Sequence, residues 1–397
     1  MLVRTARFWL LSLLMVLSAG VPAGCGSSFY AKLVPEDSVP RLAELKRLGG
    51  TQTRTTTLVG TTGHGGDAVL VAVHELGSPD RESAIVLIHG AFSDAQAWRF
   101  TAPLLARDAH VLTVDLPGCG DSDKPDADLT RYPGDGVYAP EALAERTLQA
   151  VSVRLAARAK APDRVTIVGH SLGGMIAIRM FSDDGVRERH SELLSRVDRL
   201  VLIAPVDTTA HRPDPLFQEI AEASGLRVSL GLTLGIIREK CAHGTLCAIT
   251  EGGHALREEA DKRVEILRDP RRRRALQAML RRAVPWVEGD PLRPDWLMME
   301  KLEESYSRVR VPTLIVWGRR DETLPIAMGY KLASQIPGAA ILPLDRAMHS
   351  PHLEDPDRCA DLIREFEATG TAAGVARVPG RPAHADTPAA IADTIGP

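Results

Sequence analysis

Short apolar segments and longer amphipathic segments alternate along most of this chain. Eight segments of four to seven residues are rich in Val, Ile, Leu and Thr, at residues 53–59, 68–74, 84–88, 110–115, 165–168, 200–205, 313–317 and 340–344. Segments of this length and composition predict β-strands. Residues 84–88 are apolar without alternation, which is typical of a strand covered by helices on both faces. Helix-length segments between most strands predict right-handed crossovers and a mostly parallel sheet.

The alternation stops between residues 207 and 311. This stretch contains mostly helical patterns, with amphipathic segments around residues 216–223, 255–267, 274–283 and 296–306. We therefore expect one α/β domain, formed by residues 53–206 and 312–367, that carries a helical insertion at residues 207–311. The 397 residues and the 44% hydrophobic content are sufficient for one large core.

The two ends of the chain differ from this domain. Residues 26–52 form a leader or tether, with a short helix expected around residues 39–48. Residues 368–397 are rich in Ala, Gly, Pro and Thr and have no apolar period, so we expect a disordered tail.

The first 25 residues have the pattern of a targeting segment. Arg4 and Arg7 precede an apolar run at residues 8–17, and small residues follow. An apolar run of about ten residues is too short to cross a bilayer core of about 30 Å, which favours a cleaved signal peptide. The residues around Cys25 resemble a bacterial lipoprotein processing site, although Pro22 stands where leucine is usual. We expect an exported protein, either anchored to a membrane through lipidated Cys25 or periplasmic or secreted.

The net charge and the cysteines add limited constraints. A formal net charge of −3 gives no overall reason to expect a nucleic-acid partner. Without Cys25, four cysteines remain, and Cys119 is expected to be a small packing residue. Cys241 and Cys247 could form a disulfide or could remain buried thiols. A zinc site that includes His243 is less favoured because no second ligand pair follows, and we expect no metal.

One sequence motif points directly to chemistry. The strand at residues 165–168 runs into Gly169-His-Ser171-Leu-Gly173 and then into a helical pattern. A strand that turns sharply into a helix strains the backbone of the central residue. The strand and the helix come into close contact there, so the residues two positions before and two positions after it must be small. The motif therefore predicts a nucleophile elbow that presents Ser171.

A serine nucleophile needs a base and an acid that orients the base. Asp321 follows the strand at residues 313–317, and His349 follows the strand at residues 340–344. Because the carboxyl ends of parallel strands share one edge of the sheet, these side chains are expected to lie near Ser171.

Together these motifs resemble the α/β-hydrolase superfamily, and in particular its capped members. The resemblance covers residues 53–367 and rests on residues 88–91, 115–122, 169–174, 318–321 and 349–354. It implies an α/β-hydrolase fold: a mostly parallel eight-stranded sheet flanked by helices, with a helical cap at the insertion. It also implies no cofactor.

The resemblance further implies roles for individual residues. Ser171 is the implied nucleophile, His349 the general base and Asp321 the orienting acid. The backbone N–H groups of Leu172 and Ala91 form the implied oxyanion hole, and Phe92 is a possible substitute for Ala91 or a substrate-binding residue.

Several nearby residues are alternatives. His352 is a second candidate base, and Glu322 and Asp207 are second candidate acids. We expect His89 and His170 to be structural or to line the substrate pocket, rather than to move protons.

The cap contributes further candidates. Its apolar side chains either line an acyl or ring pocket or form the core of the cap, at Leu216, Phe217, Leu230, Leu232, Leu234, Ile236 and Ile237. The arginines at 271–274, 281 and 282 either form a solvated helix face or contact an anionic lipid or acidic substrate.

The predicted chemistry follows from the nucleophile. A serine in place of an aspartate argues against haloalkane dehalogenases and epoxide hydrolases, which are similar capped enzymes. The leading prediction is hydrolysis of a small-molecule carboxylic ester or lipid through an acyl-enzyme. Carbon–carbon bond hydrolysis, lactone opening and acyl transfer are alternatives within the fold. A non-catalytic ligand-binding protein is the alternative from another class. The natural substrate and the oligomeric state cannot be read from the sequence.

Overall fold

The computed structural model describes residues 28–50, 52–60, 68–127, 129, 136–207, 215–250, 252–285, 287 and 293–377. The predicted signal peptide, Cys25 and residues 378–397 lie outside the described residues. Among the described helices, none combines the length and the apolar character that a membrane crossing requires.

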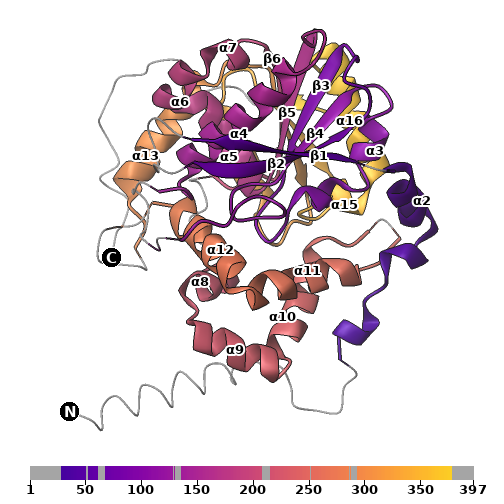
Figure 1. Cartoon of the computed structure of the whole chain (residues 1–397), viewed down its shortest axis with the longest axis vertical. Helices are drawn as coiled ribbons and strands as arrows, with labels where there is room; N and C mark the ends of the chain where they lie inside the picture. Colours follow the sequence, from indigo (N-terminus) through magenta and orange to yellow (C-terminus); the bar gives the residue numbers. More distant parts are fainter. Residues whose placement is uncertain are drawn as a thin grey trace, which may run out of the picture.

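A mixed sheet forms the centre of the molecule (Figure 1). Its strand order is β1-β2-β4-β3-β5-β6-β7-β8-β9. The eight predicted strands all form, as β1 (Thr53–Val59), β2 (Val69–Leu76), β3 (Ser83–Ile88), β4 (His110–Val114), β5 (Arg164–His170), β6 (Val197–Ile203), β7 (Thr313–Gly318) and β8 (Ala340–Leu344). β4, β3 and β5–β8 pair in parallel, whereas β1 and β2 are antiparallel to their neighbours. The structure therefore confirms the predicted α/β-hydrolase fold.

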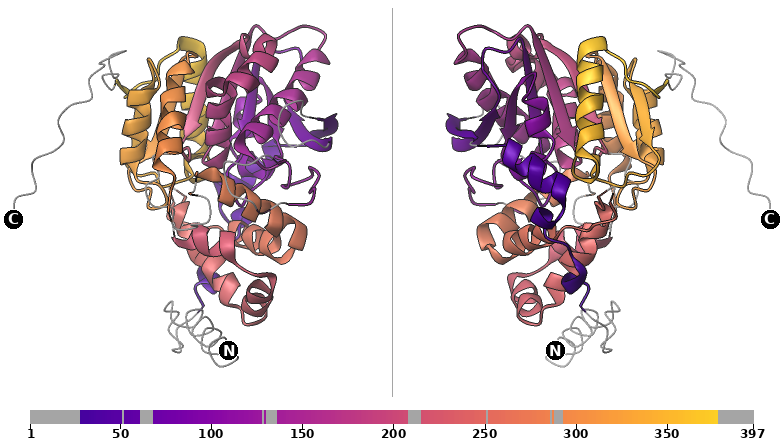
Figure 2. Two further views of the ribbon diagram at one scale, coloured as in Figure 1. Left: turned by 90° about the vertical axis from the view of Figure 1, so that its left-hand side faces the viewer. Right: turned by 90° about the vertical axis from the view of Figure 1, so that its right-hand side faces the viewer.

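Helices cover both faces of this sheet (Figure 2). One core cluster joins the sheet to α4 (Pro140–Ala156), α5 (Leu172–Ser182) and α14 (Ile326–Gln335). The other joins it to α2 (Pro40–Leu48), α3 (Ala102–Leu105) and α16 (Pro356–Thr369). Short helices complete the core layers, namely η3 (Ala95–Trp98), α6 (Asp184–Arg189), α7 (Ser191–Leu194) and α15 (Pro351–Glu354).

Strand β3 shows why its sequence does not alternate. Val86 and Ile88 belong to the first core cluster, whereas Ile85 and Leu87 belong to the second. Both faces of the strand are buried, so each position requires an apolar side chain.

The insertion between β6 and β7 forms the helical cap. Its helices are α8 (Pro215–Glu222), α9 (Gly225–Thr233), α10 (Ile236–Gly244), η4 (Thr245–Cys247), α11 (Arg257–Arg268) and α12 (Pro270–Ala283). α13 (Trp296–Ser305) and η5 (Tyr306–Arg308) lie within the predicted insertion but return to the core. Glu303 of α13 binds Lys331 and Gln335 of α14, and Tyr306 is buried in the first core cluster. The cap thus contains fewer residues than the predicted insertion at residues 207–311.

The arginines of α12 divide between the solvated face considered from the sequence and contacts within the protein. Arg271 and Arg274 are exposed to solvent. Arg273, Arg274 and Arg281 donate to backbone carbonyls of the cap or of the core. Arg282 is 1% exposed. α12 lies between the cap and the core, and Arg274 and Arg281 join the two parts through carbonyls of the loop after β4.

The tail also begins later than expected. α16 extends to Thr369, and Gly370 ends it in the left-handed conformation with φ +71°. Ala372 then packs into the second core cluster, and β9 (Ala376–Arg377) pairs antiparallel with β8. Residues 368–377 are therefore ordered, and β9 extends the predicted eight-stranded sheet.

The predicted leader is a structural part of the domain, and we call residues 28–48 the strap. It consists of η1 (Tyr30–Lys32), η2 (Glu36–Ser38) and the expected helix α2. Near its start, Val34 forms a parallel bridge to Leu256 of the cap. Near its end, Leu42 and Leu45 are buried in the second core cluster. The strap therefore connects the cap to the sheet (Figure 2).

A buried ion cluster joins the strap, the cap and the core. Arg99 of the core lies 2.7 Å from a carboxylate oxygen of Glu36 and 2.9 Å from one of Glu259 in α11. Lys46 of α2 lies 2.8 Å from the other oxygen of Glu36. Burial raises the pKa of Glu259, but the positive charges of Arg99, Lys262 and Arg263 lower it to about 2. Each buried charge therefore has a partner from another part of the chain.

We predict that Glu36→Ala lowers the free energy of unfolding by about 3 kcal/mol, because it leaves Arg99 and Lys46 without a shared partner. Glu44→Ala serves as the control. Glu44 pairs with Arg41 on the surface, where its side chain is 52% exposed, so its loss should cost less than about 1 kcal/mol. Chemical denaturation measures both values, and equal effects would contradict the structural role of the cluster.

Candidate active site

The predicted nucleophile elbow is present between β5 and α5. Ser171 has φ 51° and ψ −116°, which is a strained conformation for a residue with a side chain. A Cβ on Gly173 would lie 2.4 Å from the carbonyl oxygen of Ile88, and one on Gly169 would lie 2.5 Å from that of Gly173. Both glycines are required because the strand and the helix approach each other at backbone distance.

Backbone hydrogen bonds hold this strained residue in place. The Ser171 N–H donates to the carbonyl of Ile203 in β6, over 2.9 Å. The Ser171 carbonyl accepts hydrogen bonds from the N–H groups of Gly174, Met175 and Val206. The neighbouring strand and the first turn of α5 therefore fix Ser171 together.

Asp321 and His349 form a buried pair. Nδ1 of His349 lies 2.8 Å from Oδ2 of Asp321. The other carboxylate oxygen accepts the N–H groups of Thr323 and Leu324, at 2.9 and 2.8 Å. A proton on Nδ1 satisfies this contact and leaves Nε2 of His349 as a proton acceptor.

Ser171 and His349 line one cavity of about 400 Å³ beneath the cap. Among the described residues, no hydrogen bond joins the Ser171 hydroxyl to His349, whose ring is hydrogen-bonded to Asp321. Catalytic hydrogen bonds of this type often form only when substrate is bound. The structure thus brings the three predicted residues to one site.

The predicted oxyanion donors lie on two sides of Ser171. Leu172 is the first residue of α5, so its N–H belongs to the turn whose donors have no partner within the helix. Ala91 and Phe92 line the cavity, and Phe92 has φ 57°. A Cβ on Gly90 would lie 3.0 Å from Cβ of Ser171. Glycine at this position therefore allows the loop that carries Ala91 to approach the nucleophile.

The other histidines have structural positions. His170 lines the cavity, but its Nε2 donates to the carbonyl of His349 over 3.0 Å. Burial lowers the pKa of His170 well below its ordinary value, so the ring is neutral. His352 is 1% exposed and packs between Trp98 and His170, with ring centroids 4.5 and 4.4 Å away. Burial lowers its pKa to about 3.

The structure also shows which of the candidate acids contacts His349. Nδ1 of His349 is bonded to Asp321, rather than to Glu322 or Asp207. Glu322 lines the cavity, and Asp207 is buried. The geometry therefore favours His349 and Asp321 over the alternatives that the sequence left open.

The cap lines the cavity with a different set of side chains from the one expected. Ile236 and Ile237 line it, whereas Leu232 packs in the core of the cap. Leu230 and Leu234 are 41% and 58% exposed. The side chains of Leu216 and Phe217 lie outside the described residues. The apolar lining from the cap also includes residues that the sequence did not single out: Ile220, Ala223, Val228, Leu246 and Leu267.

Cys241 lines the cavity as a free thiol, so the considered disulfide from this residue is not formed. Burial raises its pKa to about 11, which keeps it protonated at neutral pH. Cys119 is also free and packs against the first core cluster, as expected.

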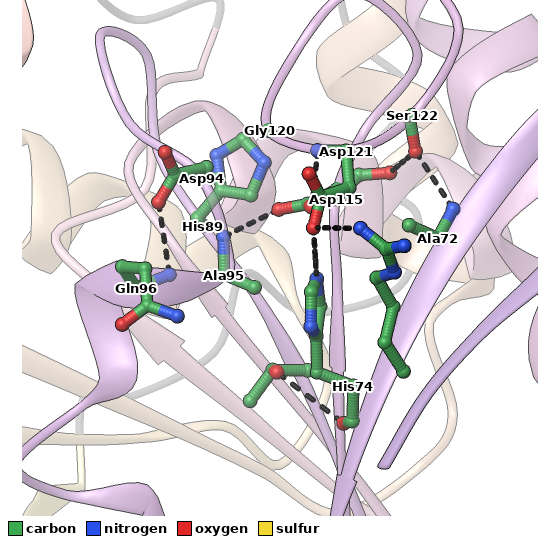
Figure 3. A network of polar contacts seen from close by, with 12 residues as sticks. Ala72, His74, His89, Asp94, Ala95, Gln96, Asp115, Gly120, Asp121 and Ser122 are labelled. Atoms are coloured by element: carbon green, nitrogen blue, oxygen red, sulfur yellow. Dashed lines mark hydrogen bonds and ion pairs between the residues drawn. The ribbon is translucent and has the colours of Figure 1, made fainter. Parts of the chain in front are cut away.

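A second polar network supports the loops beside the site (Figure 3). Asp115, just after β4, accepts the N–H of Ala95 at 2.6 Å and that of Asp121 at 2.8 Å, and its Oδ2 lies 2.9 Å from Nε2 of His74. Burial raises the pKa of Asp115, but its hydrogen bond to His74 and the other contacts lower it to about 2. This carboxylate therefore holds the loop before η3 against the loop after β4.

His74, Asp115 and Asp121 each place one possible metal ligand within 4.8 Å of the others. The oxygens of Asp115 are already used by N–H donors, and Arg54 lies 3.1 Å from Asp121. The protein itself thus satisfies these charges. His89 is structural as well, because its Nε2 accepts the N–H of Leu116.

Glu354 is a supporting residue whose role the sequence analysis did not recognise. One oxygen accepts the N–H of Met348 at 2.7 Å, and the other accepts that of Ser350 at 2.6 Å. These two residues flank His349. Burial raises the pKa of Glu354 to about 7, although the two N–H groups oppose this change. Its position five residues after His349, within the motif quoted above, was the only available signal.

We predict that Glu354 makes the stability of the protein depend on pH. Its pKa is about 7 in the folded protein against an ordinary value of 4.5, so the unfolded chain releases this proton first as the pH rises. Between pH 5 and 8 the wild type should lose up to about 3 kcal/mol more than Glu354→Gln. Chemical denaturation at both pH values measures this difference. Glu322→Gln should follow the wild type, and parallel curves for Glu354→Gln would contradict the prediction.

Comparisons with known proteins identify the family. A family model described as "Alpha/beta hydrolase family" matches residues 85–362. An uncharacterized protein of Mycobacterium bovis is 28% identical over 291 residues, which are 72% of this chain and 75% of that protein. A pimeloyl-[acyl-carrier protein] methyl ester esterase of Aromatoleum aromaticum is 27% identical over 291 residues, which are 71% of this chain and 96% of the esterase.

Solved structures share the fold. The structure of a meta-cleavage product hydrolase superposes with a TM-score of 0.52 at 23% identity, and the match covers 79% of this chain and 97% of that one. The family model spans well over half of the chain, including the elbow, Asp321 and His349. The protein is therefore a hydrolase that belongs to the alpha/beta hydrolase family.

Proposed function

We propose that this hydrolase cleaves carboxylic esters through Ser171, His349 and Asp321. The observation that carries the proposal is the buried Asp321–His349 pair, whose histidine lines the same cavity as the strained Ser171. This set of groups is what acyl transfer to serine requires. The apolar side chains that the cap places around the cavity suit the acyl or alcohol part of an ester.

The reaction needs no group beyond the substrate, water and the protein. Nε2 of His349 accepts the proton of Ser171 as the hydroxyl oxygen attacks the ester carbonyl. Asp321 holds the imidazole by Nδ1 and stabilises the imidazolium. The N–H groups of Leu172 and Ala91 bind the oxyanion. His349 then protonates the leaving alcohol, and water attacks the acyl-enzyme by the same steps to release the acid.

Carbon–carbon bond hydrolysis is the second candidate. Arg263 and Arg273 line the cavity, and cations there suit the carboxylate of a dioxo acid. A 2-hydroxy-6-oxo-dienoic acid is a suitable probe, because cleavage abolishes its conjugated absorbance. Turnover of this acid without turnover of any ester would favour the second candidate. Specific retention of a ligand without turnover would favour the non-catalytic alternative.

The central test is hydrolysis of p-nitrophenyl esters of increasing acyl length by the full chain. Ser171→Ala should lower kcat by at least about 10³-fold, because the nucleophile acts as a unit with its base. Ser93→Ala is the matched control, because Ser93 lines the same cavity without a role in the proposed chemistry, and its activity should stay within about threefold. Equal activity of Ser171→Ala and the wild type would refute the proposed mechanism.

The cap should set the preferred acyl length. Val228 of α9 lines the cavity and is 5% exposed, so Val228→Phe places a larger side chain in the proposed acyl site. We expect kcat/KM for the octanoyl ester to fall about tenfold or more, with the acetyl ester changed less than about threefold. Initial rates across the same ester series measure the shift. Uniform loss at every length would indicate that Val228 lies outside the acyl site.

A further inference from the structure

Helix α9 presents a row of leucines to solvent. Leu226, Leu230 and Leu234 are 70%, 41% and 58% exposed. They are four positions apart, so they lie along one face of the helix and its C-cap. Leu246 of η4 adds another exposed leucine to the cap, at 37%. Grouped exposed apolar side chains of this kind mark interaction surfaces. We call Leu226, Leu230 and Leu234 the leucine face.

This row is not part of the substrate cavity. Val228 and Gly231, on the other side of α9, line the cavity. α9 therefore has two apolar sides, one toward the cavity and one outward. Leu246 connects the two regions, because it is partly exposed and also lines the cavity.

Helix α9, which carries the leucine face, lies at the end of the molecule away from the sheet (Figure 1). The strap begins at the same end. The N–H groups of Phe29 and Tyr30 donate to Glu239 of α10, the helix that follows α9, at 3.0 and 3.3 Å. The ring of Phe29 stacks on His243 with centroids 4.4 Å apart. The described chain thus enters the protein beside α10, the helix that packs against α9.

The sequence before this entry point indicates what covers the leucine face. It contains the apolar run at residues 8–17 and Cys25, which was proposed above as a lipidation site. Cys25 is three residues before Ser28, so the chain between them spans at most about 11 Å. Attachment of a lipidated Cys25 to a membrane would hold the cap end close to the bilayer.

We propose that the leucine face docks on a lipid bilayer surface. Leucine side chains enter the boundary between headgroups and acyl chains, as in other interfacial helices. Arg227 of α9 is not part of this face, because it lines the cavity and lies 3.9 Å from Glu219 of α8. The strap and the buried cluster of Glu36, Arg99 and Glu259 hold the cap against the core in this orientation.

Docking in this way would also define the substrate class of the proposed esterase, and this part of the inference rests on the proposed function. The rim of the cavity at Leu246 would face the membrane, so esters dissolved in lipid would reach Ser171 without crossing water. The substrate class would then be apolar esters carried by a membrane, with small soluble esters hydrolysed independently of docking.

Fluorescence quenching tests the docking without any need for activity. The full chain with Leu230→Trp is reconstituted in phosphatidylcholine–phosphatidylglycerol vesicles whose acyl chains carry bromine. The emission added by the new tryptophan, relative to the wild type, should fall about twofold or more, because an interfacial side chain lies within about 5–10 Å of the headgroup boundary. Leu58→Trp is the control. Leu58 is 66% exposed on edge strand β1, and its tryptophan should not be quenched.

Three outcomes would overturn the proposal. Emission of Leu230→Trp that is insensitive to bromine shows that the leucine face is away from the bilayer. Equal quenching of Leu58→Trp shows adsorption without a preferred face. A blue shift of Leu230→Trp that depends on protein concentration in the absence of vesicles shows that a second copy of the chain covers the leucine face.

Activity provides the second readout. The triple variant Leu226→Ser, Leu230→Ser and Leu234→Ser should hydrolyse a soluble p-nitrophenyl ester at the wild-type rate. Its rate on an ester embedded in vesicles should fall about tenfold, because the loss of three interfacial leucines weakens docking. Leu58→Ser should keep both rates. Equal losses on both substrates would contradict the docking role, whereas no activity of any variant, including the wild type, would count against the proposed function and leave the quenching result standing.

Discussion

The close approach of three backbone segments at Ser171 is the constraint on which the rest of the site depends. A Cβ on Gly173 would come within 2.5 Å of two carbonyl oxygens, those of Ile88 and His89. β3, β5 and α5 can therefore meet only where the sequence has glycine. This contact directs the serine side chain away from the core, and β6 secures it through the Ser171 N–H. The cavity, the loop of Ala91 and the position of His349 are all arranged around this fixed point.

Burial raises the pKa of both buried glutamates, and their charged partners decide the net result. Glu259 is buried beside Arg99 and has a pKa of about 2, whereas Glu354 is buried among backbone N–H groups and has a pKa of about 7. His352 is buried without a hydrogen-bond partner for either ring nitrogen and is neutral. Among the described histidines, His349 is the one whose ring is hydrogen-bonded to a carboxylate at the cavity. The contrast between two histidines three residues apart follows from their surroundings rather than from their chemistry.

The cap, the strap and the core form one connected unit, although the chain leaves and re-enters the core between them. Arg99 of the core contacts carboxylates from the strap and from the cap at the same guanidinium nitrogen. The arginines of α12 add bonds from the cap to the loop after β4 and to α8. A cap held in this way gives the cavity a defined shape. The fold alone would permit several chemistries, so the substrate depends on this lining.

The sequence by itself determined the features that depend on neighbouring residues. The eight strands, the elbow at Ser171, the chain order of Ser171, Asp321 and His349, and the helical insertion were all predictable, because periodicity and turn chemistry are local. Tertiary structure alone decided which of His349 and His352 meets Asp321, and that Glu354 supports the loop of His349. It also decided that α13 returns to the core, that the arginines of α12 bond to the protein, and that the leader is a strap. The Glu36–Arg99 contact joins residues 63 positions apart, and the Tyr30–Asp261 contact joins residues 231 apart. No local pattern records such pairs, because they depend on how the folded chain places distant segments side by side.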